Sequence, residues 1–230
     1  MRKYFRTETY YDLLETQKEL YGLSKKGYGF RKLIPIISKD RNILLAHREI
    51  KTNKGSNTPA ISPITVKDIK EKEVKKYIQE TRESLMDYTP GKIRRKEIPK
   101  PNGGVRVLGI ADYEDKIKDQ IIKQIIEPIA EARFHGNSYG FRPGRNTHQA
   151  IERARNYMNL GYHYAVDIDI RKFFDTVDHK ILIQKIWKIG IRDRQVIEIF
   201  KKRLNSIVVD PKEKIEYRSN LGTPQGQSFA

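Results

Sequence analysis

Apolar side chains recur every three to four positions along several long segments of the chain, and this period predicts helices. The clearest case is the segment 115–134, in which Ile117, Ile121, Ile125 and Ile129 form one stripe that we expect to face a core. Further helices are predicted over much of residues 1–50 and over 66–86, 146–158 and 178–190.

The two helices predicted between residues 146 and 190 carry signals for their ends. Asn146 or Thr147 can cap the first, Asp178 can cap the second, and Gly190 is expected to end the second. The positions of the first helix that we expect to pack inward are Ile151, Ala154 and Met158.

Shorter segments rich in β-branched residues predict strands and hairpins. IRRKEIP (93–99) and VRVLGI (105–110) are joined by KPNGG, whose glycines tolerate the positive φ of a tight turn. A second hairpin is predicted from SIVVD (206–210) and KIEYR (214–218) around Pro211. Helices and hairpins that alternate irregularly favour an α+β fold over a doubly wound sheet.

The segment YAVDIDI (164–170) predicts the most hydrophobic strand, yet it contains Asp167 and Asp169. With Val166, Ile168 and Ile170 directed to a core, the two aspartates share the opposite face about 6.6 Å apart. At an effective dielectric constant near 20, their repulsion costs about 2.5 kcal/mol. Solvent, a neighbouring cation such as Arg171 or Lys172, or a divalent cation could offset this cost, and hard oxygen ligands suit Mg²⁺.

Composition and charge narrow the class of partner. The 230 residues carry 46 Lys and Arg against 29 Asp and Glu, a formal net charge of +17, spread over most of the chain. This excess predicts a polyanionic partner, first of all a nucleic acid, although a basic solvated surface alone would look the same. No cysteine is present, which excludes disulfides and thiolate chemistry, and no apolar run is long enough for a membrane span. We therefore expect a cytoplasmic protein without a membrane partner.

Two further segments fit a phosphate-bearing ligand. Lys100 and Arg106 flank the turn of the first hairpin and could clamp a triphosphate. In LGTPQG, Gly222 and Gly226 carry no side chain and would let the backbone approach a base or sugar closely. An ordinary exposed hairpin and an ordinary tight turn are the alternatives.

Four segments taken together resemble one family: RRKEIPKPNGGVRVLGI, FHGNSYGFRPGRNTHQAI, AVDIDIRKFFDTVDH and GTPQG. In this order they are similar to the reverse transcriptases of the bacterial group II intron type, which also have maturase function. LLAHREIKTNKGSN resembles the amino-terminal segment of the same type. The resemblance implies a right-hand polymerase: a helical extension over 1–41, fingers over 42–165, and part of a palm over 166–230.

The resemblance also implies roles for individual residues. Asp169 matches the first catalytic carboxylate and would hold both Mg²⁺ ions, with Asp167 beside it as a second metal candidate. Phe174 matches the aromatic residue beneath the incoming sugar. The remaining matches to nucleotide-binding positions are Lys100 and Arg106, Gln225, and the backbone at Lys172 and Phe173.

Contacts with RNA are implied for two other parts of the chain. Arg142 and Arg145 of FRPGR would meet template or primer phosphates, although a buried Arg142 that braces the fold is the alternative. Lys51 and Lys54 are candidates for template contact. The implied partners are thus an RNA template such as a group II intron, a DNA primer and a dNTP; a homodimer is left open.

The chain departs from the family in one important respect. The second metal-binding motif, Tyr-x-Asp-Asp, is absent from the 230 residues. We therefore expect that these residues by themselves do not polymerise DNA. Three interpretations stay open: the amino-terminal part of an RNA-directed DNA polymerase, a non-catalytic RNA-binding splicing factor of maturase type, and a retron-like or defence-associated relative.

Overall fold

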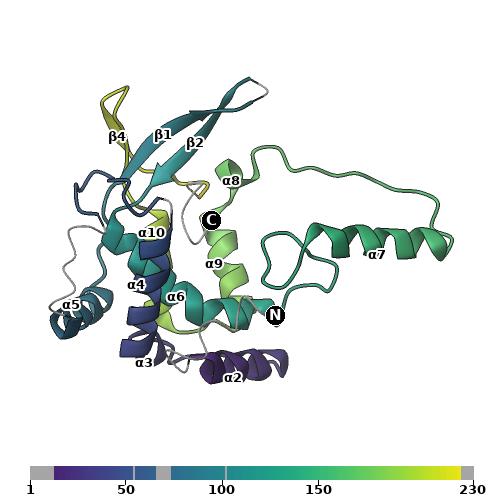
Figure 1. Ribbon diagram of the computed structural model, residues 1–230, viewed down its shortest axis with the longest axis horizontal. Helices are drawn as coiled ribbons and strands as arrows, with labels where there is room; N and C mark the ends of the chain where they lie inside the picture. Colours follow the sequence, from purple (N-terminus) through teal and green to yellow (C-terminus); the bar gives the residue numbers. More distant parts are fainter. Residues whose placement is uncertain (1–12, 54, 66–73, 102, 224–230) are drawn as a thin grey trace.

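A computed structural model describes residues 13–53, 55–65, 74–101 and 103–223, and these form a helical body, a small sheet and a protruding arm (Figure 1). The helices are α2 (Leu14–Lys25), α3 (Ile34–Ile37), α4 (Asp40–Thr52), α5 (Val74–Met86), α6 (Tyr113–Glu131), α7 (Thr147–Asn159), α8 (Phe173–Thr176), α9 (His179–Lys188) and α10 (Arg194–Leu204). The strands are β1 (Ile93–Pro99), β2 (Val105–Ile110), β3 (Val208–Asp210) and β4 (Ile215–Tyr217). The expected α+β class is confirmed.

Helix α6 is the centre of the body and packs against α2 and α4. The expected isoleucine stripe is confirmed, because Ile117, Ile121, Ile125 and Ile129 are all at most 1% exposed. Each isoleucine buried in this way contributes about 1.5–3 kcal/mol of hydrophobic stabilisation. Helix α6 therefore forms the centre of a well-packed core, against which α2 and α4 are held.

The sheet joins the two predicted hairpins in the order β2-β1-β3-β4. Strands β1 and β2 pair in antiparallel register, with Ile98 opposite Arg106, and β3 pairs with β4 in the same way. Strand β1 also pairs in parallel with β3, so the two hairpins form one surface. Both hairpin predictions are confirmed, and the β1–β2 hairpin projects beyond the helical body (Figure 1).

The strand predicted over 164–170 is wrong for this structure. These residues run as an exposed extended segment without strand pairing, and Val166, Ile168 and Ile170 are 84%, 81% and 61% exposed. The alternation that predicts a strand is present, but a strand also needs a hydrogen-bonded neighbour, and the described residues supply none.

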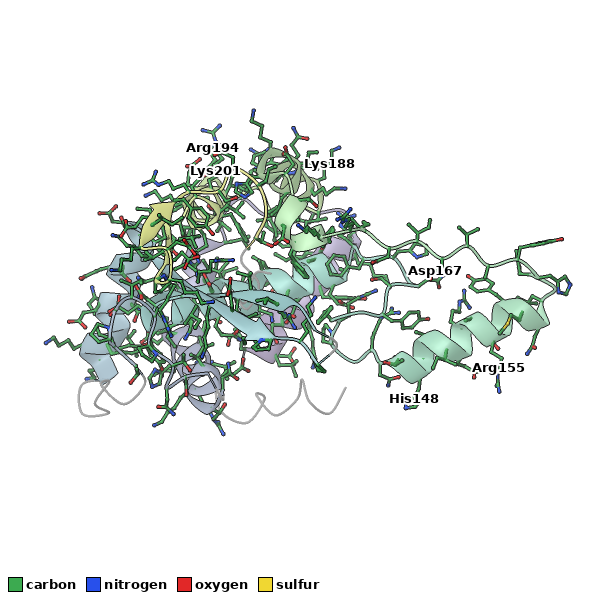
Figure 2. The ribbon with its side chains drawn as sticks, turned by 90° about the horizontal axis from the view of Figure 1, so that it is seen from above. His148, Arg155, Asp167, Lys188, Arg194 and Lys201 are labelled. Atoms are coloured by element: carbon green, nitrogen blue, oxygen red, sulfur yellow. The ribbon has the colours of Figure 1, made fainter. Side chains whose placement is uncertain are left out.

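Helix α7 and this extended segment together form the arm. Figure 2 shows His148, Arg155 and Asp167 on the arm, away from the body that carries Lys188, Arg194 and Lys201. The expectation that α7 packs inward is also wrong, since Ile151, Ala154 and Met158 are exposed. The amphipathic pattern is real, but no described segment covers its apolar face.

Both predicted helix caps are present. Asn146 and Gln149 form a reciprocal capping box at the start of α7, and Asp178 Oδ1 accepts a hydrogen bond from the Ile181 N–H at the start of α9. Gly190 follows α9 with φ of +111°. A side chain there would bring Cβ within 2.8 Å of the Tyr28 carbonyl oxygen, so glycine is required.

Asp193 caps two helices at once. Its Oδ1 accepts from the Gln195 and Val196 N–H groups of α10, and its Oδ2 accepts from Leu33 and Ile34 N–H at the start of α3. Asp193→Ala is expected to lower the free energy of unfolding by about 2–3 kcal/mol, because a cap is lost and the Leu33 amide is left buried without its acceptor.

Urea denaturation followed by circular dichroism measures this effect, with Asp178→Ala as the matched control. Asp178 caps one helix, so its loss should cost about 1 kcal/mol. Equal losses for the two variants would contradict the double role of Asp193.

None of the helices in the described ranges is long and apolar enough to cross a membrane.

Candidate nucleotide and nucleic-acid site

The β1–β2 hairpin presents Lys100 and Arg106 close to its turn. Gly103 and Gly104 adopt φ of +78° and +83°, and the Lys100 N–H donates to the Gly104 carbonyl at 3.1 Å. This geometry is the reason for the glycine pair, since other residues rarely adopt positive φ. Both cationic side chains are exposed at the projecting end of the hairpin.

A cavity of about 170 Å³ lies where this hairpin faces α8 and the segment 217–223. Val107 and Arg95 line it from the hairpin, and Phe174 and Gly222 line it from the other side. Among the residues that the family resemblance assigns to nucleotide binding and that the structure describes, Phe174 alone lines this cavity. Phe173 is exposed, and its ring meets the Phe174 ring edge-on at 5.5 Å between centroids.

Gly222 makes a close backbone contact beneath the cavity. Its φ is +82°, and a Cβ atom would lie 2.8 Å from the Phe174 carbonyl oxygen. The Gly222 N–H donates to the Val177 carbonyl at 2.8 Å, and the Thr223 N–H donates to the Phe174 carbonyl at 2.7 Å. Gly222 and Thr223 are therefore fastened to α8 and to the residue that follows it, and the close approach that Gly222 allows is to protein backbone.

His179 adds a side-chain contact to this junction. Its Nε2 lies 2.8 Å from the Gly222 carbonyl oxygen, and the neighbouring Asp178 forms an antiparallel bridge with Leu221. From the sequence, His179 is only a residue near a helix cap. Its contact joins positions 43 residues apart, which no local pattern reveals.

Asp167 and Asp169 lie on the exposed segment that leads into α8. Lys172, the residue before α8, adopts the left-handed conformation with φ of +52°. Within the described ranges, no group of three or more His, Asp or Glu side chains gathers into a metal-binding cluster. The two carboxylates fit Mg²⁺ by donor type, and they supply only part of its six oxygen ligands.

Arg142 is a buried brace. It is 9% exposed, its Nε and Nη2 donate to the Glu131 carboxylate at 2.6–3.1 Å, and its Nη1 donates to the His135 and Ser138 carbonyls at 2.7 and 2.8 Å. The hydrogen bonds with Glu131 raise the pKa of the guanidinium. This is the bracing alternative that the sequence left open.

The other candidate RNA contacts have different surroundings. Arg145 lies over the Tyr139 ring at 5.1 Å and donates to the Gly136 carbonyl at 2.5 Å. Lys51 is exposed in the last turn of α4. Lys54 and Gln225 lie outside the described residues.

Arg95 is a charged cavity residue that the sequence does not single out. Its guanidinium pairs with Asp210 of β3 and with Glu97 at 3.1 Å. The hydrogen bond from Arg95 lowers the pKa of Asp210, and one from Lys212 lowers the pKa of Glu97. Arg95 and Lys212, together with Asp210 and Glu97, thus fix this side of the hairpin to β3 and the turn after it. These ion pairs can form because β1 lies parallel to β3.

Comparison with known proteins decides the family. The family model described as "Reverse transcriptase (RNA-dependent DNA polymerase)" matches residues 98–230, which include the β1–β2 turn, α8 and the Gly222 contact. The chain belongs to the reverse transcriptase family. This match confirms the resemblance on which the expected fold rests.

The relatives of this reverse transcriptase chain include proteins of intron origin. It is 31% identical over 199 residues to "Group II intron-encoded protein LtrA" of Lactococcus lactis, covering 86% of this chain and 32% of that protein. It is 31% identical over 221 residues to "Uncharacterized 91 kDa protein in cob intron" of Schizosaccharomyces pombe, covering 90% and 26%. The chain therefore spans about a third or less of the length of these relatives.

A solved structure shares the fold of this reverse transcriptase chain. A chain of the "Partial Cas6-RT-Cas1--Cas2 complex" superposes with a TM-score of 0.54 at 23% identity, covering 86% of this chain and 32% of that one. At this identity the likeness concerns the fold alone. The fold of this chain is thus one that another protein also adopts.

Proposed function

We propose that the chain forms the nucleotide-receiving part of an RNA-directed DNA polymerase, which binds an RNA template and a dNTP and extends a DNA primer. The observation that carries the proposal is that the β1–β2 hairpin, Phe174 of α8 and Gly222 surround one cavity. Membership of the reverse transcriptase family supplies the reaction class. Kinship with a protein encoded by a group II intron supports intron RNA as the template.

The hairpin is proposed to hold the triphosphate. Arg95 lines the cavity with its charge balanced by Asp210 and Glu97, and Lys100 and Arg106 supply positive charge at the exposed end of the hairpin. Arginine binds phosphate oxygens through a planar fork and lysine binds them as a point charge. The backbone at Lys172 and Phe173 is proposed to donate to phosphate oxygens from the opposite side.

The sugar of the nucleotide is proposed to pack on Phe174. An aromatic ring held at the cavity wall leaves less room for a 2′-hydroxyl, so bulk would favour a dNTP over a ribonucleotide. Gln225 is proposed to contact the nucleotide and the template base. The start of this segment is held in place by two backbone hydrogen bonds, from the Gly222 N–H to the Val177 carbonyl and from the Thr223 N–H to the Phe174 carbonyl.

Asp169, with Asp167 beside it, is proposed to hold Mg²⁺. When bound in such sites, divalent cations activate the primer 3′-oxygen and neutralise the leaving pyrophosphate. The part of the chain described here would contribute charge and position, which do most of the work in phosphoryl transfer.

RNA binding by the 230-residue chain gives a direct test. Fluorescence anisotropy with a 5′-labelled single-stranded RNA should show affinity falling about 10- to 100-fold between 50 and 200 mM salt, because several Lys and Arg contacts release counterions. Arg145→Gln should make the slope of log K against log salt shallower by about 0.7. Lys201→Gln is the control, since Glu198 already pairs with that ammonium at 2.6 Å.

An affinity that does not change with salt would contradict the proposed RNA contacts, as would equal slopes for Arg145→Gln and Lys201→Gln.

A non-catalytic RNA-binding splicing factor is the second candidate. The specific observation in its favour is that the described residues bring no third carboxylate or histidine to Asp167 and Asp169. Asp169→Asn separates the two candidates in a protein that carries these residues together with a complete set of metal ligands. Both candidates expect unchanged RNA affinity, and only the polymerase expects DNA synthesis that the substitution abolishes.

A further inference from the structure

One peptide unit of the cavity wall is held from both sides by the connection between α8 and α9. The Gly222 N–H donates to the Val177 carbonyl at 2.8 Å, and the Thr223 N–H donates to the Phe174 carbonyl at 2.7 Å. Between these two amides, the Gly222 carbonyl oxygen lies 2.8 Å from Nε2 of His179. Two of these three contacts are made by backbone groups, and the third is made by a side chain, so a substitution can remove it alone.

The acceptor in the third contact fixes a proton on the imidazole. A carbonyl oxygen can only accept a hydrogen bond, so Nε2 of His179 must carry a proton. Nε2 carries a proton in the charged ring and in one of the two neutral tautomers, and it has none in the other. Without that proton, two lone pairs would face each other. The contact therefore requires His179 to have the Nε2–H form.

Gly222 depends on contacts of this kind. Its φ is +82°, and a Cβ atom would lie 2.8 Å from the Phe174 carbonyl oxygen and 2.9 Å from that of Asp175, so a larger residue does not fit. Glycine loses more backbone freedom on folding than any other residue. Because Gly222 has no side chain to pack, its own N–H and carbonyl groups must hold it in place, and His179 binds the carbonyl.

The start of α9 places the imidazole. His179 is the first residue of this helix, and the preceding Asp178 caps it by accepting from the Ile181 N–H at 2.8 Å. Asp178 also forms an antiparallel bridge with Leu221, the residue before Gly222. The half-buried ring of His179 is therefore carried by a capped helix that lies directly beside its acceptor.

We propose that His179 is a positioning residue, whose Nε2–H fixes the Gly222 peptide and thereby the wall that receives the nucleotide. Gly222 and Thr223 line the cavity of about 170 Å³ together with Phe174, and His179 contacts this wall through Gly222. A wall that is free to move must be ordered when the ligand binds, and this ordering lowers affinity. The inference rests on the proposed nucleotide binding; a role of His179 in helix stability alone is the alternative.

Three substitutions of His179 separate the hydrogen bond from the bulk of the ring. His179→Gln places an amide N–H where Nε2 lies, His179→Asn reaches only as far as Nδ1, and His179→Ala removes the ring. Isothermal titration calorimetry measures the affinity of the 230-residue chain for Mg²⁺·dTTP. The affinity should fall about three- to tenfold for His179→Ala and His179→Asn, the equivalent of one lost hydrogen bond, and less than about twofold for His179→Gln.

Two controls exclude a general loss of structure. His163→Ala alters an exposed histidine of the arm and should bind dTTP as the wild type does. The affinity for the labelled single-stranded RNA should be unchanged in all three variants of His179, whereas a chain that fails to fold would lose affinity for both ligands.

The imidazole signals give a readout that needs no nucleotide. Long-range ¹H–¹⁵N spectra at pH 8 distinguish the two neutral tautomers, and His179 of the wild-type chain is expected to have the Nε2–H form. The amide signals of Gly222 and Thr223 should shift in His179→Ala and return toward their wild-type positions in His179→Gln.

Equal dTTP affinities for His179→Ala and the wild type would overturn the positioning role and leave the proposed nucleotide binding intact, even if the variant is less stable. A loss in His179→Gln as large as that in His179→Ala would overturn the hydrogen bond as its basis, as would an Nδ1–H tautomer of His179. If the wild-type chain binds no dTTP although His179 has the Nε2–H form, the proposed nucleotide binding falls and this role falls with it.

Discussion

Replacing Arg203 by methionine is expected to lower the free energy of unfolding by about 3–5 kcal/mol, which would be the largest effect of any single substitution on stability proposed for this chain. Arg203 of α10 is 3% exposed, and its Nε and Nη2 donate to Asp119 of α6 at 3.1–3.3 Å. Its Nη1 lies 3.5 Å from Asp115 Oδ2. Methionine would leave both buried carboxylates without their cation.

The loss should depend on pH in a known direction. Burial raises the pKa of Asp119 to about 6 even with Arg203 present. A raised carboxyl pKa contributes stability that is present below about pH 4 and is lost as the pH rises through 6. Without Arg203 the pKa of Asp119 rises further, so the destabilisation should be larger at pH 8 than at pH 5.

Urea denaturation at these two pH values measures the prediction. Arg194→Met is the matched control, because Arg194 is an exposed arginine of the same helix and should change stability by less than about 0.5 kcal/mol. Similar stabilities for Arg203→Met and Arg194→Met would show that the buried interaction of Arg203 with Asp119 and Asp115 does not stabilise the fold.

The second large effect concerns chemistry. In a protein that carries these residues together with a complete set of metal ligands, Asp169→Asn is expected to reduce RNA-templated DNA synthesis about 10³-fold or more, because metal catalysis supplies several kcal/mol of charge stabilisation. Single-turnover primer extension on an RNA template measures it.

Two companion variants make this result specific. Asp167→Asn should have a smaller effect, and Asp87→Asn, which alters an exposed carboxylate just after α5, should have none. Synthesis at the wild-type rate by Asp169→Asn would contradict the proposed role of Asp169 as a metal ligand.

Features that depend on local pattern could be predicted from the sequence. The isoleucine stripe of α6, the caps Asn146 and Asp178 and the glycine turn of the β1–β2 hairpin all appear as expected. Each is decided within a few residues, by side-chain period, by one capping hydrogen bond or by the φ that a turn requires.

Features that depend on a distant partner could not be predicted. The segment 164–170 has the alternation of a strand, but pairing decides whether a strand forms. Asp193 and Arg203 look like ordinary surface charges in the sequence, yet each joins elements more than 80 residues apart.

In the candidate site, too, some residues could be predicted from local sequence and others depend on distant contacts. The position of Phe174 at the cavity follows from its place in the family motif. Arg95 reaches the cavity because β1 pairs with β3, and His179 reaches the site through its contact with Gly222. Neither of these two contacts has a signal in the local sequence. Lys100 and Arg106 stand outside the cavity lining, so their role depends on how a bound triphosphate extends toward the hairpin tip.

The central claim is that a nucleotide binds between the hairpin and α8, with its cation on Asp169. Titrating the ¹⁵N-labelled chain with Mn²⁺·dTTP tests it, because the paramagnetic ion broadens only nearby amide signals. The expected result is selective broadening at Val107, Phe174 and Gly222, with Leu20 of α2 unaffected, and a marked loss of that broadening in Asp169→Asn. Broadening that avoids α8, or that is unchanged in Asp169→Asn, would contradict the claim.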